Sequence, residues 1–328
     1  MELSPQNLSV LFEGYEMIFN RGFEGAPSYW QMIATEVPSG TKETLYPFLK
    51  RTLQLREFTG ARVLQNLEAV SYLIVNRHFE GTIGINLDDL KDDQYGVYND
   101  MIASLGEAVK VWPDQLIFSM MKAAVTGASV DIGMDFVVPP PIGYDGVPFF
   151  SANHPTGPVG RGGGVQSNIN SSGTGSYWFL INGARAVRPF LWQTREPFKF
   201  VRMNAVTDEK VFTENIMRVG VDGRANAGVS LWQLAYASNT DLSNPANYGA
   251  AIAAMREIKD DAGRPFGSWT GDPAKKFLVV PPSLEETARQ LLHSEFGAIA
   301  GTGGAVAGVP GTNIWRNSAT LIVSDYLS

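Results

Sequence analysis

The stretch YGVYNDMIASLGEAVKVWPDQLIFSMMKAA, residues 95–124, has the residue spacing of one long helix. Its apolar side chains return every three or four positions, which places them on one face of an α-helix. That face consists of Met101, Ile102, Leu105, Ala108, Val109, Trp112, Leu116, Met120 and Ala124. The spacing keeps its phase across Pro113, although a proline inside a helix removes one backbone hydrogen bond and kinks the axis. We therefore predict one long bent helix that serves as the spine of a domain.

Residues 126–176, which follow this helix, are rich in Gly, Pro, Ser and Asn and read as a long loop. A loop of this length inside a compact domain is unusual and often functional. Its central part, YDGVPFFSANHP, brings together Asp145, Ser151 and His154, the residue types of a hydrolytic triad. No strand–turn–helix elbow surrounds Ser151, and the glycine run that follows lacks the Lys-Ser/Thr of a phosphate-binding loop. We predict a surface excursion that touches neighbouring molecules, and a Ser/His/Asp hydrolase stands as an alternative.

Residues 41–87, upstream of the spine helix, read as an extended arm. The β-rich runs YLIV at 72–75 and TIGI at 82–85 indicate strands. The arm is about twice as long as a common hairpin and strongly charged in its middle, which favours a projection onto a partner over an ordinary edge hairpin. The candidate assembly-interface residues lie at its predicted tip and are Thr59, Gly60, Ala61 and Arg62.

The N-terminal segment, residues 5–20, carries apolar side chains at helical spacing, and Ser4 followed by Pro5 is a favourable helix start. The breaker cluster GFEGAP at 22–27 follows it. A terminal helix beside a flexible joint can pack on its own domain or on a neighbouring molecule. Packing on its own domain is the expectation.

Strand patterns and helix patterns are mixed in the second half of the chain. Strands are predicted at 177–181, 210–221, 228–236, 277–280 and 319–323, and the two longest are joined by a turn signal, Asp222-Gly223. Asn244-Pro245 opens a helix that runs to about Ile258. Ser283 and Glu286 form a capping box for another helix, which runs to about Phe296. Because strands and helices do not alternate regularly, the fold class is α+β.

The composition excludes several classes of protein. The chain has 328 residues, a net charge of −7 and no cysteine, so disulfides, thiolate zinc sites and thiol nucleophiles are excluded. No apolar run approaches the roughly 20 residues of a membrane span. No basic block supports sequence-independent binding to nucleic acid. The N-terminus has no signal-peptide pattern, which indicates a cytosol-like compartment.

No metal or cofactor site is expected. An acidic cluster precedes the spine helix and consists of Asp88, Asp89, Asp92 and Asp93. It lacks the residue order of a calcium loop, and acids at this place favour the N-terminus of a helix. The three histidines are His78, His154 and His293, and no two of them have metal-ligand spacing on one helix face.

Several short motifs, taken in order, resemble the major head subunits of Mu-like bacteriophages and prophages, the gpT family. They are FEGTIGI at 79–85, WPDQLIF at 112–118, DGVPFFSANHP at 145–155, RPFLWQTR at 188–195, Trp232-Gln233, FLVVP at 277–281 and VSDYL at 323–327. Each motif alone is weak, and their common order over nearly the whole chain carries the resemblance. The Pro-rich segment at 126–143 departs from the family pattern.

The resemblance implies the HK97-like phage capsid fold. Its parts would be an N-terminal arm (1–40), an E-loop (41–87), a peripheral-domain spine helix (88–125), a Gly/Pro-rich loop insertion (126–176), peripheral-domain strands (177–240) and an axial domain (241–328). It also implies a subunit without catalytic residues or cofactors that forms the hexamers and pentamers of an icosahedral shell.

Such a shell encloses double-stranded phage DNA without sequence-specific contacts. Its other implied partners are portal, scaffold and decoration proteins, and it assembles in the cytoplasm of the bacterial host. An encapsulin-like compartment that holds protein cargo is the alternative with the same fold.

Overall fold

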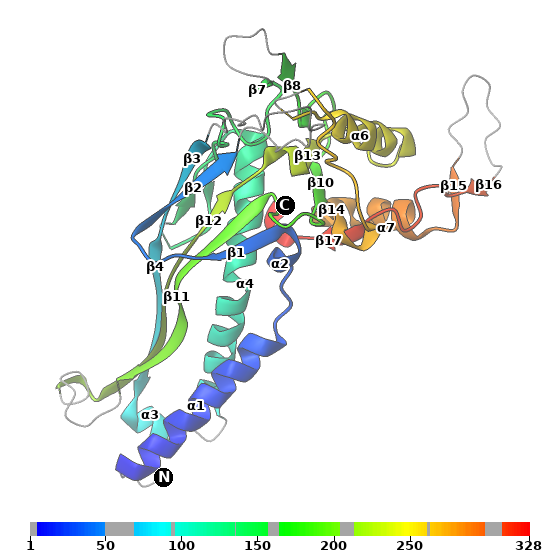
Figure 1. Ribbon diagram of the computed structural model, residues 1–328. Coiled ribbons are helices and arrows are strands. Elements are labelled where there is room, and N and C mark those ends of the chain that lie inside the picture. Colours follow the sequence, from blue (N-terminus) through cyan, green and yellow to red (C-terminus); the bar gives the residue numbers. More distant parts are fainter. Residues whose placement is uncertain are drawn as a thin grey trace.

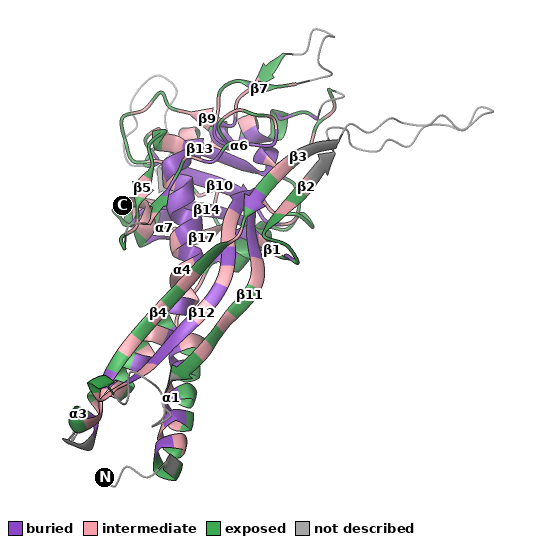
Figure 2. Ribbon diagram, turned by 90° about the vertical axis from the view of Figure 1, so that its left-hand side faces the viewer, coloured by how far each residue is buried: buried purple, intermediate pink, exposed green. Residues whose placement is uncertain are grey.

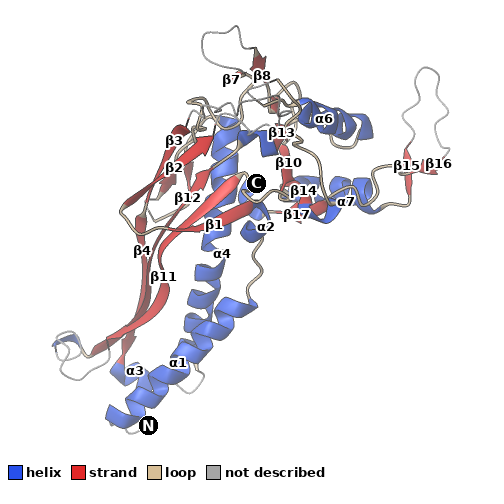
Figure 3. Cartoon of the chain, viewed as in Figure 1, coloured by secondary structure: helices blue, strands red, loops and turns tan. Residues whose placement is uncertain are grey.

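The computed structural model describes residues 5–49, 69–92, 96–134, 136–156, 164–203, 213–260, 263–298 and 310–328. A long lobe consists of two helices and a curved sheet, and a more compact lobe holds a second sheet with two shorter helices (Figures 1 and 3). Both helices and sheets are present without βαβ alternation, which confirms the α+β class. No helix among the described residues is long and apolar enough to cross a membrane.

The predicted spine is a single helix, α4 (Val97–Thr126), which runs through Pro113 without interruption. It begins and ends at glycines in the left-handed region, Gly96 with φ 68° and Gly127 with φ 68°. Its N-terminal half buries Ile102 and Val109, and its C-terminal half buries a denser set of side chains: Leu116, Ile117, Phe118, Met120, Met121 and Ala124.

The N-terminal helix α1 (Pro5–Gly25) packs along α4, as expected for packing on its own domain. It buries Leu8, Phe12, Tyr15 and Phe19. The two helix backbones approach closely at two glycines. A Cβ atom on Gly106 would lie 2.2 Å from the carbonyl oxygen of Phe19, and one on Gly22 would lie 2.2 Å from that of Ala103. Larger side chains at these glycines would force the helices apart.

The chain enters the body of the protein at a short helix, α2 (Trp30–Ile33), which is fixed by a buried carboxylate of the spine. Asp114 accepts the backbone N–H groups of Tyr29, at 3.0 Å, and Trp30. Burial raises the pKa of Asp114, while these N–H groups and the charge of Lys110 act in the opposite direction. Asp114, which directly follows Pro113 in the helix, therefore links the N-terminal segment to the spine.

The curved sheet has the strand order β1-β11-β12-β4, with β1 at Ala34–Pro38, β11 at Phe190–Met203, β12 at Ile216–Val229 and β4 at Arg77–Asn86. Alternate residues of β12 are buried against α1 and α4, among them Met217, Val219 and Val221. Figure 2 shows this buried face along the long lobe.

The predicted turn at Asp222-Gly223 is wrong, because β12 continues straight through it. Asp222 pairs with Lys199 on one side and with Glu80 on the other. A Cβ atom on Gly223 would lie 2.5 Å from the ring of Phe198, so this glycine makes room for an aromatic side chain. The predicted strand at 228–236 is also interrupted, by a 3-10 turn at Trp232–Leu234.

The second sheet has the order β17-β14-β10-β13-β9. The strands are β17 (Thr320–Val323), β14 (Lys276–Val280), β10 (Trp178–Asn182), β13 (Ala235–Ser238) and β9 (Ile169–Asn170). The three middle strands are buried at every residue, which fits a sheet covered on both faces. The helices α6 (Pro245–Glu257) and α7 (Glu285–His293) lie beside it (Figure 1).

The remaining elements are short. Two strands of the predicted arm (41–87) pair with each other, β2 (Glu43–Leu49) and β3 (Ala69–Val75), whereas its last part is β4 of the curved sheet. The other pairs are β5 (Val130–Asp131) with β6 (Val137–Val138), β7 (His154–Pro155) with β8 (Val165–Gln166), and β15 (Phe296–Ala298) with β16 (Pro310–Thr312). Asp88 and Asp89 lie in the first turn of α3 (Leu87–Asp92), where the helix dipole favours acids.

The predicted capping box at Ser283 is wrong, whereas the helix start at Asn244 is confirmed. Ser283 lies in a 3-10 turn, and α7 begins at Glu285 without a side-chain cap. A bond from the N–H of Leu284 to the carbonyl of Pro281 closes this turn and displaces the serine from the cap position. The helix ends at His293, and Phe296 belongs to β15. By contrast, the side chain of Asn244 accepts the N–H of Ala246 at 3.1 Å.

These two helix starts predict opposite results for a pair of alanine variants. Asn244→Ala should lower the free energy of unfolding by about 1 kcal/mol, because it removes an N-cap hydrogen bond. Ser283→Ala should change it by less than about 0.5 kcal/mol, as at other surface positions. Urea unfolding of the unassembled subunit measures both values. Equal losses in the two variants would contradict the cap assignment.

Asp114 predicts a pH dependence of stability. Because its pKa is raised above the ordinary 3.8, the stabilising effect of its proton is complete below pH 3.8 and is lost as the pH rises through the folded value. The Asp114→Asn variant keeps an acceptor oxygen and cannot titrate. The stability of the wild-type subunit relative to this variant should therefore fall as the pH rises above 3.8. Urea unfolding at several pH values tests this, and a constant difference would argue against the raised pKa.

Candidate functional site

The loop YDGVPFFSANHP packs into the protein and is not the surface excursion that its composition predicts. Phe149, Phe150 and His154 are buried. The ring of Phe149 lies 5.3 Å from that of Phe190 on β11, and Phe150 lies 5.4 Å from Phe179 on β10. Aromatic pairs at such distances contribute beyond simple burial. The loop thus joins the two sheets, and its polar residues are drawn inward with it.

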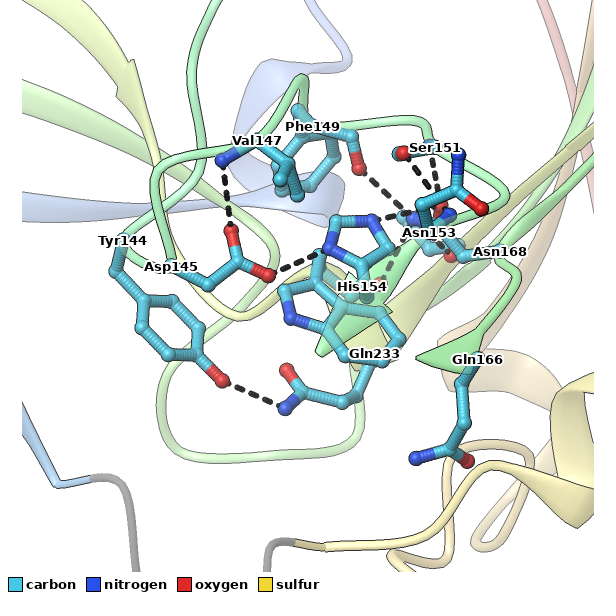
Figure 4. A network of polar contacts seen from close by, with 12 residues as sticks. Tyr144, Asp145, Val147, Phe149, Ser151, Asn153, His154, Gln166, Asn168 and Gln233 are labelled. Atoms are coloured by element: carbon cyan, nitrogen blue, oxygen red, sulfur yellow. Dashed lines mark hydrogen bonds and ion pairs between the residues drawn. The ribbon is translucent and has the colours of Figure 1, made fainter. Parts of the chain in front are cut away.

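His154 is held at both ring nitrogens (Figure 4). Its Nδ1 lies 2.6 Å from Oδ2 of Asp145, and its Nε2 lies 3.1 Å from Oδ1 of Asn168. The side chain of His154 is fully buried, and that of Asp145 is nearly so. The other Asp145 oxygen accepts the N–H of Val147 at 3.4 Å. The pair therefore ties the start of the loop to its end.

Asn168 determines which atoms of the network donate hydrogen bonds and which accept them. Its Nδ2 donates to the carbonyls of Phe149, Trp232 and Ala235, and its Oδ1 accepts the N–H of Ser151 at 2.9 Å. Since Oδ1 is an acceptor, Nε2 of His154 must be the donor. The Nδ1 contact then needs a second proton, carried by the ring or by the Asp145 carboxyl. Neither ring nitrogen of His154 then has a lone pair free for a substrate.

The indole of Trp232 covers one face of the His154 ring. It stacks on the imidazole of His154 with ring centroids 3.9 Å apart and an interplanar angle of 6°. The next residue, Gln233, donates from Nε2 to the hydroxyl of Tyr144 at 2.7 Å. Two motifs that are far apart in the sequence, the loop and Trp232-Gln233, are thus two halves of one buried cluster.

The hydrolytic triad of the alternative interpretation does not form. Ser151 Oγ accepts the N–H of Asn153 at 3.1 Å and does not bond to His154. The ring nitrogen that a base would use is occupied by Asn168. Asp145 and His154 do pair, but as a structural link and not as part of a nucleophilic site.

The base of the predicted arm is fixed to the curved sheet by one face of the β2–β3 ribbon. Ile74 is buried, the hydroxyl of Tyr46 donates to Gln193 at 2.7 Å, and the N–H of Val229 donates to the hydroxyl of Tyr72 at 3.4 Å. Burial raises the pKa of Tyr72, while the bond from Val229 lowers it. This attachment holds the ribbon against the body at its root.

The opposite face of the ribbon is apolar and exposed. Leu45 and Leu73 are opposite each other in the register, and they are 58% and 48% exposed. The tip candidates Thr59, Gly60, Ala61 and Arg62 lie outside the described residues. Among the described residues, the root of the arm therefore presents an exposed apolar surface.

The sequence matches the family of the Mu-like prophage major head subunit gpT over residues 8–327. The chain belongs to this family. It is 32% identical to the major capsid protein of Escherichia phage Mu over 332 residues, which cover all of both chains. It is 31% identical to the major head subunit of the Mu-like prophage FluMu of Haemophilus influenzae, over 99% of each chain. The family match includes residues 126–143, the segment for which the sequence alone suggested a departure from the family pattern.

The fold agrees with this family. A subunit from the procapsid of bacteriophage JBD30 superposes with a TM-score of 0.73 at 29% identity, over 99% of this chain and all of the other. A subunit of the JBD30 capsid gives a TM-score of 0.71 at 23% identity over all of both chains. The expected phage capsid fold is confirmed.

Sequence reasoning missed the residues that organise this site. Asn168 was not singled out, and Trp232-Gln233 was noted only as part of the family pattern. A buried amide is recognised by the backbone groups that it bonds, and those groups are brought together by folding. The role of Asp114 could not be predicted for the same reason, because the backbone groups of Tyr29 and Trp30 that it binds lie 85 and 84 positions away in the sequence.

The network predicts that His154 is needed for the fold and Ser151 is not. His154→Ala leaves Asp145 buried without its partner and should lower the free energy of unfolding by about 3–5 kcal/mol. Ser151→Ala and Asn153→Ala, in the same loop, should each cost about 0.5 kcal/mol or less. Urea unfolding of unassembled subunits compares the three. A small cost for His154→Ala would show that the network is not a structural link.

Proposed function

We infer that this chain is the major capsid protein of a Mu-like phage or prophage. The observation that carries this conclusion is the match over the full length to head subunits, together with the capsid fold. The chain is a structural subunit of the virion, and its function is to assemble with copies of itself into the head shell.

The proposed assembly consists of hexamers and pentamers that close into an icosahedral shell around double-stranded DNA. Such shells use heterologous contacts, in which one surface of a subunit meets a different surface of the next. A net charge of −7 gives little electrostatic attraction to DNA, which suits a wall that encloses DNA without binding it in a sequence-specific way.

Other partners follow from the relatives. The JBD30 capsid is found decorated with trimers of a minor capsid protein. We propose that this chain likewise meets portal, scaffold and decoration proteins during assembly in the cytoplasm of the bacterial host. We assign it no catalytic role, because the residues of the suspected triad are used to hold the loop.

The segments retain the roles expected from the family. We propose that 1–40 is the N-terminal arm, 41–87 the E-loop and 88–125 the spine helix with its leading acids. The strands of 177–240 then belong to the peripheral domain, and 241–328 to the axial domain. Support comes from the single long helix and from the ribbon at the root of the arm. The sheet that joins β10 and β13 to β14 and β17 crosses the boundary at 240, so the two later segments share a core.

Electron microscopy of the purified protein tests the function directly. Expression of the chain alone or with its phage's scaffold should give closed shells in negative stain. An assay for nucleic acid in the particles, and mass spectrometry for protein cargo, then separate a phage head from an encapsulin-like compartment. Particles that hold a defined protein cargo would overturn the phage-head assignment.

The arm predicts a separation between folding and assembly. Replacing its tip, residues 52–65, by a short Gly-Ser turn should leave a folded subunit, because the ribbon is anchored at its root by Ile74 and Tyr72. The same protein should no longer form complete shells, since specific interfaces bury about 1,200–2,000 Å² and the arm would supply part of this area.

Three point variants refine this experiment. Leu73→Ser on the exposed ribbon face should fold normally and assemble poorly, whereas Ile74→Ser on the buried face should unfold the root. Arg62→Glu should weaken assembly more at low salt than at high salt if it meets an acidic surface. Sedimentation and microscopy measure the outcome, and normal shells from the tip replacement would show that the arm is dispensable.

A further inference from the structure

The β5–β6 hairpin follows the spine helix and forms a compact turn of its own. The N–H of Ile132 bonds to the carbonyl of Phe136, and the N–H of Phe136 bonds to the carbonyl of Gly133, both at 3.0 Å. The side chain of Asp131 accepts the N–H of Gly133 at 2.8 Å. These bonds give the turn a defined shape without help from other parts of the chain.

Phe136 mounts the hairpin on the spine helix and the curved sheet. Its ring lies 6.0 Å from Trp112 of α4 and 5.5 Å from Phe79 of β4, and the Arg77 guanidinium stands 4.7 Å above it. Gln115 of α4 also donates to the carbonyl of Ile132 at 3.3 Å. The hairpin is therefore held by aromatic, cation–π and hydrogen-bond contacts and is a rigid feature of the surface.

The outer side of this hairpin is apolar. Met134 is 101% exposed, and Val137 is 44% exposed beside the inward-facing Phe136 and Val138. Met134 also has φ 53°, a left-handed conformation that methionine rarely adopts and that glycine, asparagine and aspartate adopt easily. A strained apolar side chain at a fully exposed tip lowers the stability and solubility of a free subunit. The unfavourable backbone conformation and the full exposure of Met134 suggest that this side chain has a function in the assembled protein.

We propose that the β5–β6 hairpin is an assembly contact in which Met134 inserts into an apolar recess on a neighbouring copy of this chain. This proposal rests on the shell function proposed above. A second copy is the favoured partner because every copy in a shell has neighbours. A rigid knob also loses little conformational freedom when it meets the same surface many times. The flexible thioether of methionine fills irregular recesses, and methionine is enriched at protein interfaces.

The decisive variant is Met134→Gly, which removes the apolar side chain and at the same time relieves the backbone strain. The subunit should unfold at the same temperature as the wild type or a higher one. The concentration at which shells form should rise by about tenfold or more, because burial of one methionine is worth about that factor. Met134→Leu, which keeps an apolar side chain, should assemble far better than Met134→Gly.

Asn317→Gly is the matched control. Asn317 is an exposed residue with φ 55°, so the change to glycine is made in the same left-handed conformation without removing an apolar side chain. It should assemble at the wild-type concentration. Light scattering and negative-stain microscopy over a range of subunit concentrations measure all four proteins.

Several results would overturn the proposal. Met134→Gly shells that form at the wild-type concentration would show that the hairpin makes no assembly contact. A lower melting temperature for Met134→Gly would show that Met134 serves the fold. Normal shells that fail to bind an added minor capsid protein would identify a different partner. If wild-type protein formed no shells while remaining folded, the proposed function itself would fail.

Discussion

The spine helix α4 contributes side chains to two hydrophobic cores, and the rest of the structure depends on this shared helix. Ile102 and Val109 belong to the core formed with α1 and the long part of the curved sheet. Leu116, Phe118 and Met121 belong to the larger core that also holds the second sheet, α6 and α7. One rigid element that is buried at both ends fixes the two lobes relative to each other. Burial of apolar area along its whole length is also what keeps the helix continuous through Pro113.

The helix also organises what lies next to it. Gly106 lets α1 approach to backbone contact, and Asp114 ties the chain after α1 to the middle of the spine. On either side of Asp114, Trp112 and Gln115 hold the β5–β6 hairpin. The three attachments face different neighbours, so a single helix carries the N-terminal segment, the body and an exposed turn. The surfaces that these neighbours form are thus connected through one packed element.

The His154 cluster shows how residues suited to catalysis can serve packing instead. Burial of a histidine and an aspartate is unfavourable unless every polar atom finds a partner. Here Asp145 and Asn168 supply the partners of the histidine, and the ring of Trp232 covers its face. Asn168 itself is satisfied by backbone carbonyls. The same contacts that close the loop onto the core remove the free nitrogen that a base would need. The chemistry of the residues was apparent in the sequence, and their use was set by their surroundings.

The sequence by itself determined the spine helix, the cap at Asn244, the strands at 277–280 and 319–323, the α+β class and the family. These features depend on periodicity or on residues that are neighbours in the chain, and the family depends on the order of local motifs. Only the tertiary structure decided that β12 runs through Asp222-Gly223, because the partners on both sides of the strand are far away in the sequence. It also decided that the 144–155 loop turns inward. Burial of Phe149 and Phe150 stabilises this arrangement. The cost of removing the loop's polar groups from water is offset because Asn168 forms hydrogen bonds with them. Composition describes what a segment contains, whereas burial and bond partners are properties of the whole folded chain.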